Sequence, residues 1–211
     1  MKYITKHQTE AAFNAAKDNL AKPHVAKTLD NGEVHYLPNQ ETSNTTITVK
    51  YNVTDTRTPT KIINRVDVIN YMAIDTKVLD GTRPTTGHTF STTGIHTVNF
   101  YIKEGVSDVG GLPLFNLISY ITEVTIPSAI TTIGESAFEG CLLLNTFTME
   151  DTVTTIGEKA FKDCGLLSSI NLSSSLRTVN DFAFCNCSSL PREVETAIDE
   201  INPTALECPK E

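Results

Sequence analysis

The sequence predicts a mainly β protein that ends in a short repeat solenoid. Three observations support this prediction: a 23-residue repeat from Val124 onward, alternation of apolar and polar residues over 41–104, and abundant Thr and Ser with no Trp. A length of 211 residues allows one or two small domains. We expect an attachment segment over residues 1–40, a small antiparallel sandwich over 41–106, repeats over 107–190 and a cap over 191–211.

The net charge of −8 excludes some classes of partner. Residues 1–123 carry 12 basic and 12 acidic side chains, whereas residues 124–211 carry 5 and 13, so the whole acidic excess lies in the C-terminal part. That part should repel phosphate backbones, and we expect no nucleic-acid partner. No apolar run approaches the roughly 20 residues that span a bilayer, so we expect no membrane segment.

The N-terminal segment predicts a short helix and a β-hairpin. Thr5 and Gln8 form a capping-box pair before an alanine-rich stretch, and Pro23 ends this helix. Residues 24–38 then read as two short strands around an Asn-Gly turn at 31–32. A thin alanine-lined helix and a lone hairpin need something to pack on, so this segment is interpreted as an attachment element.

Residues 41–106 have the alternation of antiparallel strands. Apolar residues fall two apart in this part of the chain, and turn signals such as Asp80-Gly81 and Thr93-Gly94 separate the runs. The spacing predicts a small antiparallel β-sandwich. The alternating residues are Ile47, Val49, Tyr51 and Val53, then Val66 and Val68, then Val98, Phe100 and Ile102.

The C-terminal part superimposes on itself at a spacing of 23 residues. Each unit offers Leu-x-x-Ile-x-Ile, which places three apolar side chains on one face of a short strand, and then Ile-Gly-x-x-Ala-Phe-x-x-Cys as a returning turn. One unit cannot bury that face, whereas stacked units bury it between them. The columns include Ile133, Ile156 and Val179; Phe138, Phe161 and Phe184; Cys141, Cys164 and Cys187; Leu144, Leu167 and Leu190; and Val124, Phe147 and Ile170.

Both ends of the repeats carry cap signals. Gly110–Thr122 reads as a degraded first unit, because Phe115 stands 23 residues before Phe138. Residues 191–201 predict a helix with Ser189 as its N-cap, acidic residues in the first turn and a proline at a tolerated early position. We expect the degraded unit and the helix to close the two ends of the stack.

The run from Ile121 to Cys141 resembles the BspA-type leucine-rich repeat, whose units read roughly Ile-Pro-x-x-Val-Thr-x-Ile-Gly-x-x-Ala-Phe-x-x-Cys. This resemblance covers residues 110–190 and implies a non-catalytic leucine-rich-repeat solenoid. The segment from His88 to Phe100 looks like the last hairpin of immunoglobulin-like sandwiches, which implies an Ig-like fold for residues 41–106. Residues 23–38 are similar to a leader of structural proteins from phages and prophages of gut Bacteroidales.

The cysteines predict buried thiols and leave one pairing open. Cys141, Cys164 and Cys187 form an inward column whose Cβ atoms, on strands ~4.8 Å apart, lie too far apart for a disulfide, so free thiols are expected. Cys185 and Cys208 stand outside this column, and they form either a disulfide or two exposed thiols. A zinc site is rejected, since no C-x-x-C loop and no clear fourth ligand are present. No metal or cofactor is expected.

No catalytic set is recognisable, and the protein is not expected to be an enzyme. All five histidines precede the repeats, and none has a Ser or Cys in a nucleophile context. His88 and His96 are interpreted as imidazoles on a sheet surface. An enzyme acting on glycan would have only the exposed acids Glu123, Glu150 and Asp151 to use.

The outward face of the repeat strands is the candidate binding surface. Its side chains alternate with the core residues and should form a flat, hydroxyl-rich surface that suits protein or glycan, although Thr and Ser are also ordinary strand-surface residues. A second column, Thr132, Thr155 and Thr178, runs beside the other short strand. The candidate residues are Glu123, Thr125, Thr146, Thr148, Glu150, Ser169, Asn171 and Ser173.

Two functions follow as hypotheses. The N-terminus has no apolar stretch typical of a secretory signal, so the signal has been removed or the protein leaves its cell by another route. Together with the leader resemblance, this favours a virion component of a phage or prophage, such as a tail or head fibre or decoration protein. Its N-terminal segment would bind other virion proteins, its repeats would bind a host surface, and it could form a homo-oligomer. The alternative is a secreted BspA-like surface adhesin for host matrix protein or glycan.

Overall fold

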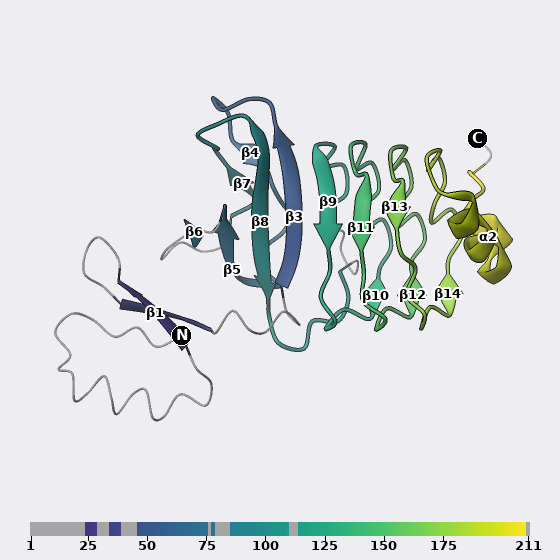
Figure 1. Cartoon of the computed structure of the whole chain (residues 1–211), viewed down its shortest axis with the longest axis horizontal. Coiled ribbons are helices and arrows are strands. Elements are labelled where there is room, and N and C mark those ends of the chain that lie inside the picture. Colours follow the sequence, from purple (N-terminus) through teal and green to yellow (C-terminus); the bar gives the residue numbers. More distant parts are fainter. Residues whose placement is uncertain are drawn as a thin grey trace. The chain divides into compact units, whose positions relative to one another are not determined.

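Figure 1 shows the computed structural model of the chain, which divides into residues 1–43 and residues 44–211. The structure describes residues 46–75, 77–78, 85–109 and 114–209, together with the two strands of the first unit. The helix expected before Pro23 lies outside the described residues. In the described part of the chain, no helix is long and apolar enough to cross a bilayer.

The hairpin expected within residues 1–43 is confirmed. β1 (His24–Thr28) pairs with β2 (Val34–Pro38) in antiparallel register, with Thr28 opposite Val34 at the turn end. The Asn-Gly pair expected in the turn lies outside the described residues.

An antiparallel sheet forms the first part of residues 44–211. β3 (Thr46–Val53) pairs with β8 (Gly94–Ile102), which pairs with β5 (Ile69–Ile74) and through it with β6 (Lys77–Val78). Every second residue of β3 is buried, as the alternation predicts. β4 (Thr60–Lys61) and β7 (Gly87–His88) form a separate two-stranded sheet. This part is therefore strand-rich, and the immunoglobulin-like arrangement stays a prediction.

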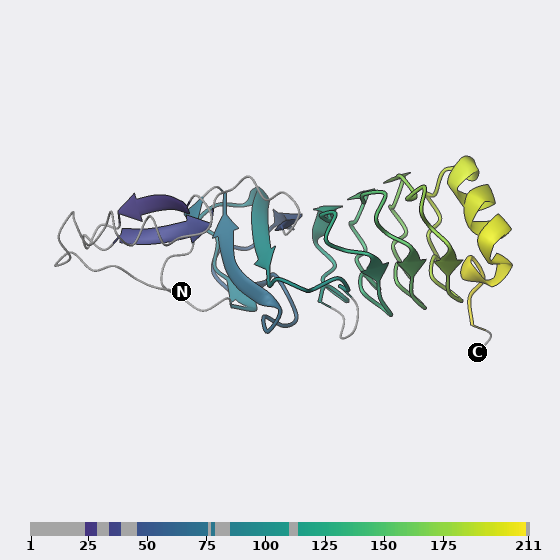
Figure 2. The ribbon, with the colours of Figure 1, turned by 90° about the horizontal axis from the view of Figure 1, so that it is seen from below.

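The repeats form a leucine-rich-repeat-like stack, as predicted. β9 (Ile121–Thr125), β11 (Thr146–Thr148) and β13 (Ser169–Ile170) pair in parallel. β10 (Thr132–Ile133), β12 (Thr155–Ile156) and β14 (Thr178–Val179) pair in parallel on the returning side of each unit. Both sets keep a register of 23 residues, and Figure 2 shows the successive units standing one beside the next.

A ladder of phenylalanines fills the stack. The rings of Phe115, Phe138, Phe161 and Phe184 lie nearly parallel, with centroids 5.5, 5.6 and 5.1 Å apart in turn. Neighbouring units approach so closely that a Cβ on Gly157 would lie 2.6 Å from the backbone nitrogen of Glu135. The glycine is therefore required by backbone contact between units.

The two sheets are joined by β9. β3 pairs with β9 in antiparallel register, with Val49 opposite Val124, so the antiparallel strands and the repeat strands make one seven-stranded sheet in the order β13-β11-β9-β3-β8-β5-β6. The degraded first unit stacks on the next one, with the Phe115 N–H donating to the Ala137 carbonyl at 3.3 Å. β3 covers the edge of β9 beside it, which the sequence did not predict.

The C-terminal end carries the expected helix, α2 (Arg192–Ile201). Ser189 does not cap it: the N-cap is Pro191, with no side-chain cap bond, and the Ser189 hydroxyl donates to the Gly165 carbonyl at 2.7 Å instead. A short 3-10 helix, η2 (Pro203–Ala205), then continues the stack as a partial fifth unit, because its Ala205 carbonyl accepts the Phe184 N–H at 2.8 Å.

His96 on β8 is buried, so its expected place on the sheet surface is wrong. In the alternation of β8 it shares the inward face of Val98 and Phe100. Its Nδ1 lies 2.5 Å from an oxygen of Asp75, and its Nε2 lies 2.8 Å from the Thr92 carbonyl. An acceptor at each ring nitrogen favours the imidazolium. Burial lowers the pKa of His96, but the hydrogen bonds to Asp75 and Thr92 outweigh it and raise the pKa above its usual value.

We expect the free energy of unfolding to fall as the pH rises through the raised pKa of folded His96. The folded state binds this proton more tightly than the unfolded state does, so the contribution is complete below about pH 6.5 and is lost above the folded pKa. Asp75 has a lowered pKa, and its contribution is lost only in acid, as the pH falls through that pKa. Burial lowers the pKa of His88. The unfolded state therefore binds this proton more tightly, and the free energy of unfolding falls as the pH drops below about 6.5, the reverse of the His96 effect.

The measurement is urea unfolding of the wild type and of His96→Asn from about pH 5 to about pH 8.5. The variant should lose the alkaline decline while keeping the His88 contribution. An identical pH dependence in both proteins would contradict the prediction.

Candidate functional site

The outward face of the repeat strands is exposed, as predicted. Glu123 and Thr125 lie on β9, Thr146 and Thr148 on β11, and Ser169 on β13; all are half-buried or exposed. Glu150 and Asn171 lie beyond the ends of their strands and are exposed too. Seven of the eight candidate residues are therefore half-buried or exposed.

Ser173 is the exception, and its predicted outward position is wrong. β13 ends at Ile170, so the chain has already turned when it reaches Ser173. The residue is only 6% exposed, and its hydroxyl accepts the Ser175 N–H at 3.1 Å. Its role is to close this turn.

The outward face of the repeat strands β9, β11 and β13, called the strand face from here on, extends beyond the repeats. β3 continues it through the pairs Thr48 with Thr125 and Lys50 with Glu123. On the same face of the sheet, β8 places Asn99 opposite Thr48, and the Thr48 hydroxyl donates to the Asn99 side-chain oxygen at 2.8 Å. Sequence reasoning missed this extension, because the alternating polar residues of β3 carry no mark of which strand they will join.

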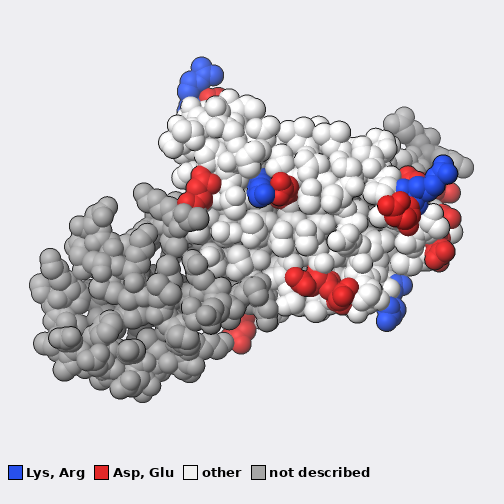
Figure 3. Space-filling model, viewed as in Figure 1, with Lys and Arg blue, Asp and Glu red and all other residues white. Residues whose placement is uncertain are grey.

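The strand face has little net charge. Lys50 Nζ lies 2.6 Å from Glu123 Oε2, so the two charges on adjacent strands compensate each other. Figure 3 shows few charged side chains over β3, β9, β11 and β13. The face offers mainly hydroxyl and amide groups, which donate and accept hydrogen bonds without a strong field.

The second threonine column lies on the other sheet. Thr132 on β10 and Thr155 on β12 are half-buried, and Thr178 on β14 is exposed. These residues belong to strands of only two residues each, so the surface they form is narrower than the strand face.

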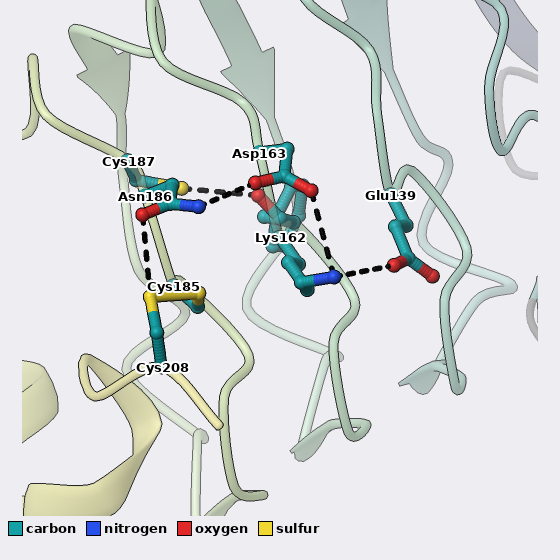
Figure 4. Close-up of a disulfide and its surroundings, with 8 residues drawn as sticks. Glu139, Lys162, Asp163, Cys185, Asn186, Cys187 and Cys208 are labelled. Carbon is teal, nitrogen blue, oxygen red and sulfur yellow. Dashed lines mark hydrogen bonds and ion pairs between the residues drawn. A yellow bond between two sulfur atoms is a disulfide. The ribbon is translucent and has the colours of Figure 1, made fainter. Parts of the chain in front are cut away.

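Side-chain bonds link successive units along the column of Glu139, Lys162 and Cys185 (Figure 4). Lys162 Nζ lies 3.1 Å from Glu139 Oε1, and 23 residues further on Cys185 forms a disulfide with Cys208. The two cysteines are themselves 23 residues apart, so Cys208 occupies the column position of a fifth unit. Of the two states left open by the sequence, the structure contains the disulfide. The repeat period, extended past the helix, was the signal that could have identified it.

The inward cysteines are free and buried, as predicted. The Cys141, Cys164 and Cys187 thiols each contact a backbone carbonyl of the preceding unit, at 3.3, 3.2 and 3.0 Å. Burial raises the pKa of Cys141 and of Cys187 to about 12, so both stay protonated at neutral pH. A protonated, buried thiol is a poor nucleophile, and this column is structural.

One of the three exposed acids, Asp151, is held in its ionised form. A hydrogen bond from the Ser174 N–H lowers the pKa of Asp151, which keeps this group ionised and unsuited to donate a proton near neutral pH. Within the described ranges, no three His, Cys, Asp or Glu side chains come together as a metal site.

Comparison with known proteins identifies the repeats. Residues 111–208 match the BspA type leucine rich repeat region in six copies. A solved structure, the T. pallidum leucine rich repeat protein, is 33% identical over 32% of this chain and 34% of its own, with a TM-score of 0.32. The chain thus spans about a third of that protein. No curated protein matches the sequence. The repeats therefore indicate a binding, adhesin-like protein.

We expect reduction of the disulfide to lower the free energy of unfolding by about 3 kcal/mol, because the bridge closes a loop of 23 residues in the unfolded chain. The measurement is urea unfolding of the wild type and of Cys208→Ser, each with and without dithiothreitol. The variant should match the reduced wild type and should not respond to the reductant. Equal midpoints for all four samples would contradict the prediction.

Proposed function

We propose that this chain is a non-catalytic binding protein that displays its strand face to a ligand outside the cell. The observation that carries the proposal is the continuity of this face across β3, β9, β11 and β13. A flat surface made of several strands suits an extended partner better than a small molecule, which usually enters a concave site.

The chemistry of the strand face favours a neutral, hydroxyl-bearing ligand, and we take this to be a glycan. Thr125, Thr148 and Ser169 offer hydroxyls that both donate and accept, as sugar hydroxyls do. The compensation of Lys50 by Glu123 leaves little field to attract a charged polymer. Matrix protein is the other ligand class considered.

A location outside the cell is part of the proposal. The disulfide between Cys185 and Cys208 supports it, because disulfides form and persist in oxidising compartments and are rare in the cytosol. A secreted adhesin and a virion component would both meet this condition.

We expect Thr148→Arg to weaken binding of neutral oligosaccharides at least about tenfold, since the arginine adds bulk and charge at the centre of the strand face. Thr178→Arg is the matched control, because it places the same side chain on an exposed strand threonine of the other sheet. Binding would be measured by biolayer interferometry on a panel of immobilised neutral and sulfated oligosaccharides and matrix proteins.

Three outcomes would count against this proposal. They are equal effects of the two variants, preference for the sulfated sugars, and no retained ligand anywhere in the panel. Selective loss with Thr148→Arg on a matrix protein alone would keep the strand face as the site and replace glycan as the ligand.

A virion role for the same binding protein is a second candidate, and the similarity of residues 23–38 to a phage leader favours it. In this version residues 1–40 attach to other virion proteins, and residues 41–106 form an immunoglobulin-like spacer. The repeats contact the host surface, and the protein could be displayed as a homo-oligomer. Mass spectrometry of purified particles tests this version. Absence of the protein from the particles would remove it.

A further inference from the structure

An apolar groove crosses the repeats at the turns that precede β9, β11 and β13. Six large apolar residues are exposed in the described part of the chain, and four of them gather at these turns: Leu117, Leu142, Leu143 and Leu166, at 73%, 54%, 37% and 49% exposure. Leu117, Leu142 and Leu166 line a groove of about 710 Å³. Exposed apolar side chains scattered singly need no explanation, but a cluster marks an interaction site.

Stacking of the units does not account for these leucines. The inward columns are apolar in every unit, whereas the column of Leu142 contains Ser119, Gly165 and Ser188. The same stack therefore forms with a serine or a glycine at this position. The leucines add apolar surface that the fold itself leaves in water.

Leu117 is strained as well as exposed. Its φ is 58°, in the left-handed region that a bulky side chain rarely adopts. The equivalent residues in the next three units are Gly140, Asp163 and Asn186, with φ of 73°, 63° and 60°, and these residue types tolerate that conformation. Leucine is the least suitable residue for this conformation in its column, although Phe182 adopts a similar φ of 59° in another turn of the stack.

Gly140 makes room for the Leu117 side chain. A Cβ on Gly140 would lie 2.7 Å from Leu117 Cδ2, so the leucine lies directly over the glycine of the next unit. The left-handed φ of Leu117 thus aims its side chain along the groove and over the neighbouring unit. This arrangement builds an apolar floor across two units.

The other end of the groove is polar and carries a negative charge. Asn186 Nδ2 donates to Asp163 Oδ1 at 2.6 Å, which orients the carboxylate. Lys162 Nζ lies 3.6 Å from Asp163 Oδ2 but only 3.1 Å from Glu139, so one cation is shared by two acids (Figure 4). One negative charge is left in excess beside the apolar floor.

We propose that this groove binds a segment of a partner protein in which a large apolar side chain stands next to a lysine or arginine. The apolar side chain would cover Leu117 and Leu142, and the cation would face Asp163. The leucines favour a protein segment over a sugar, since they offer no hydrogen bonds, and the volume suits a few side chains. This site is separate from the strand face and does not rest on the proposed function.

The test uses the full chain and three labelled peptides of equal length, measured by fluorescence anisotropy. One carries Leu-Leu-Lys-Arg at its centre, the second Leu-Leu-Glu-Glu and the third Ser-Ser-Lys-Arg. We expect the first to bind at least about tenfold more tightly than the third, since burial of a leucine is worth about tenfold or more in affinity. The first should also bind more tightly than the second, because the glutamates of the second would face the Asp163 carboxylate.

The variants take their residues from the same columns, so the stack should tolerate them. Leu117→Gly copies Gly140, Leu142→Ser copies Ser188 and Asp163→Asn copies Asn186. The two leucine variants should weaken binding of the first peptide about tenfold, and Asp163→Asn should remove the preference for Lys-Arg over Glu-Glu. Ile95→Ser, at an exposed apolar residue of β8, is the control and should change nothing.

Several results would overturn the proposal. No binding of the first peptide, equal binding of all three, or loss of binding with Ile95→Ser would each do so. Sedimentation velocity adds another: a wild-type dimer that Leu142→Ser dissociates would make a second copy of this chain the occupant. Thr148→Arg should leave peptide binding intact, so failure of the strand-face proposal and failure of this one are distinguishable.

Discussion

Parallel backbone pairing between units is the interaction on which the rest of this structure depends. No unit has a core of its own, and each completes its burial only against the next one. The close approach at Gly157 and the stacked phenylalanine rings follow from this pairing. It also fixes what the surface can be, because every position of a unit becomes a column along the stack.

The two surfaces described above arise from different parts of that column arrangement. The strand face comes from alternation, since residues that point away from the core point to solvent in each unit. The groove comes from the left-handed turn, where Gly140, Asp163 and Asn186 satisfy the backbone and Leu117 does not suit it. The first surface is therefore a general product of the repeat. The second depends on individual residues that depart from it.

The period of 23 predicted the parts of the fold that repeat, together with the free thiols and most of the strand face, because identical spacing places identical environments on top of one another. It could not predict the pairing of β3 with β9, since nothing local in either strand specifies a partner some 70 residues away. The alternation does not hold for Ser173, because this residue lies beyond the end of β13. The polarity of His96 favours a surface position, whereas the alternation of β8 places it inward. The disulfide could have been predicted from the sequence, since Cys208 follows Cys185 by one repeat period of 23 residues.

The two ends of the repeat stack are covered in different ways. At one side β3 occupies the hydrogen-bonding edge of β9, and at the other the partial fifth unit and its disulfide cover the last phenylalanine. An unpaired edge of parallel strands would be a template for adding further chains, so the pairing of β3 with β9 acts against fibre-like assembly at that end, whereas β13 is the outer strand of the sheet at the other. Such a stack can lengthen without disturbing β3 or the C-terminal cap, by duplication of a 23-residue unit between two existing ones. Each duplication would widen the strand face by about one strand spacing, ~4.8 Å, while leaving both ends untouched.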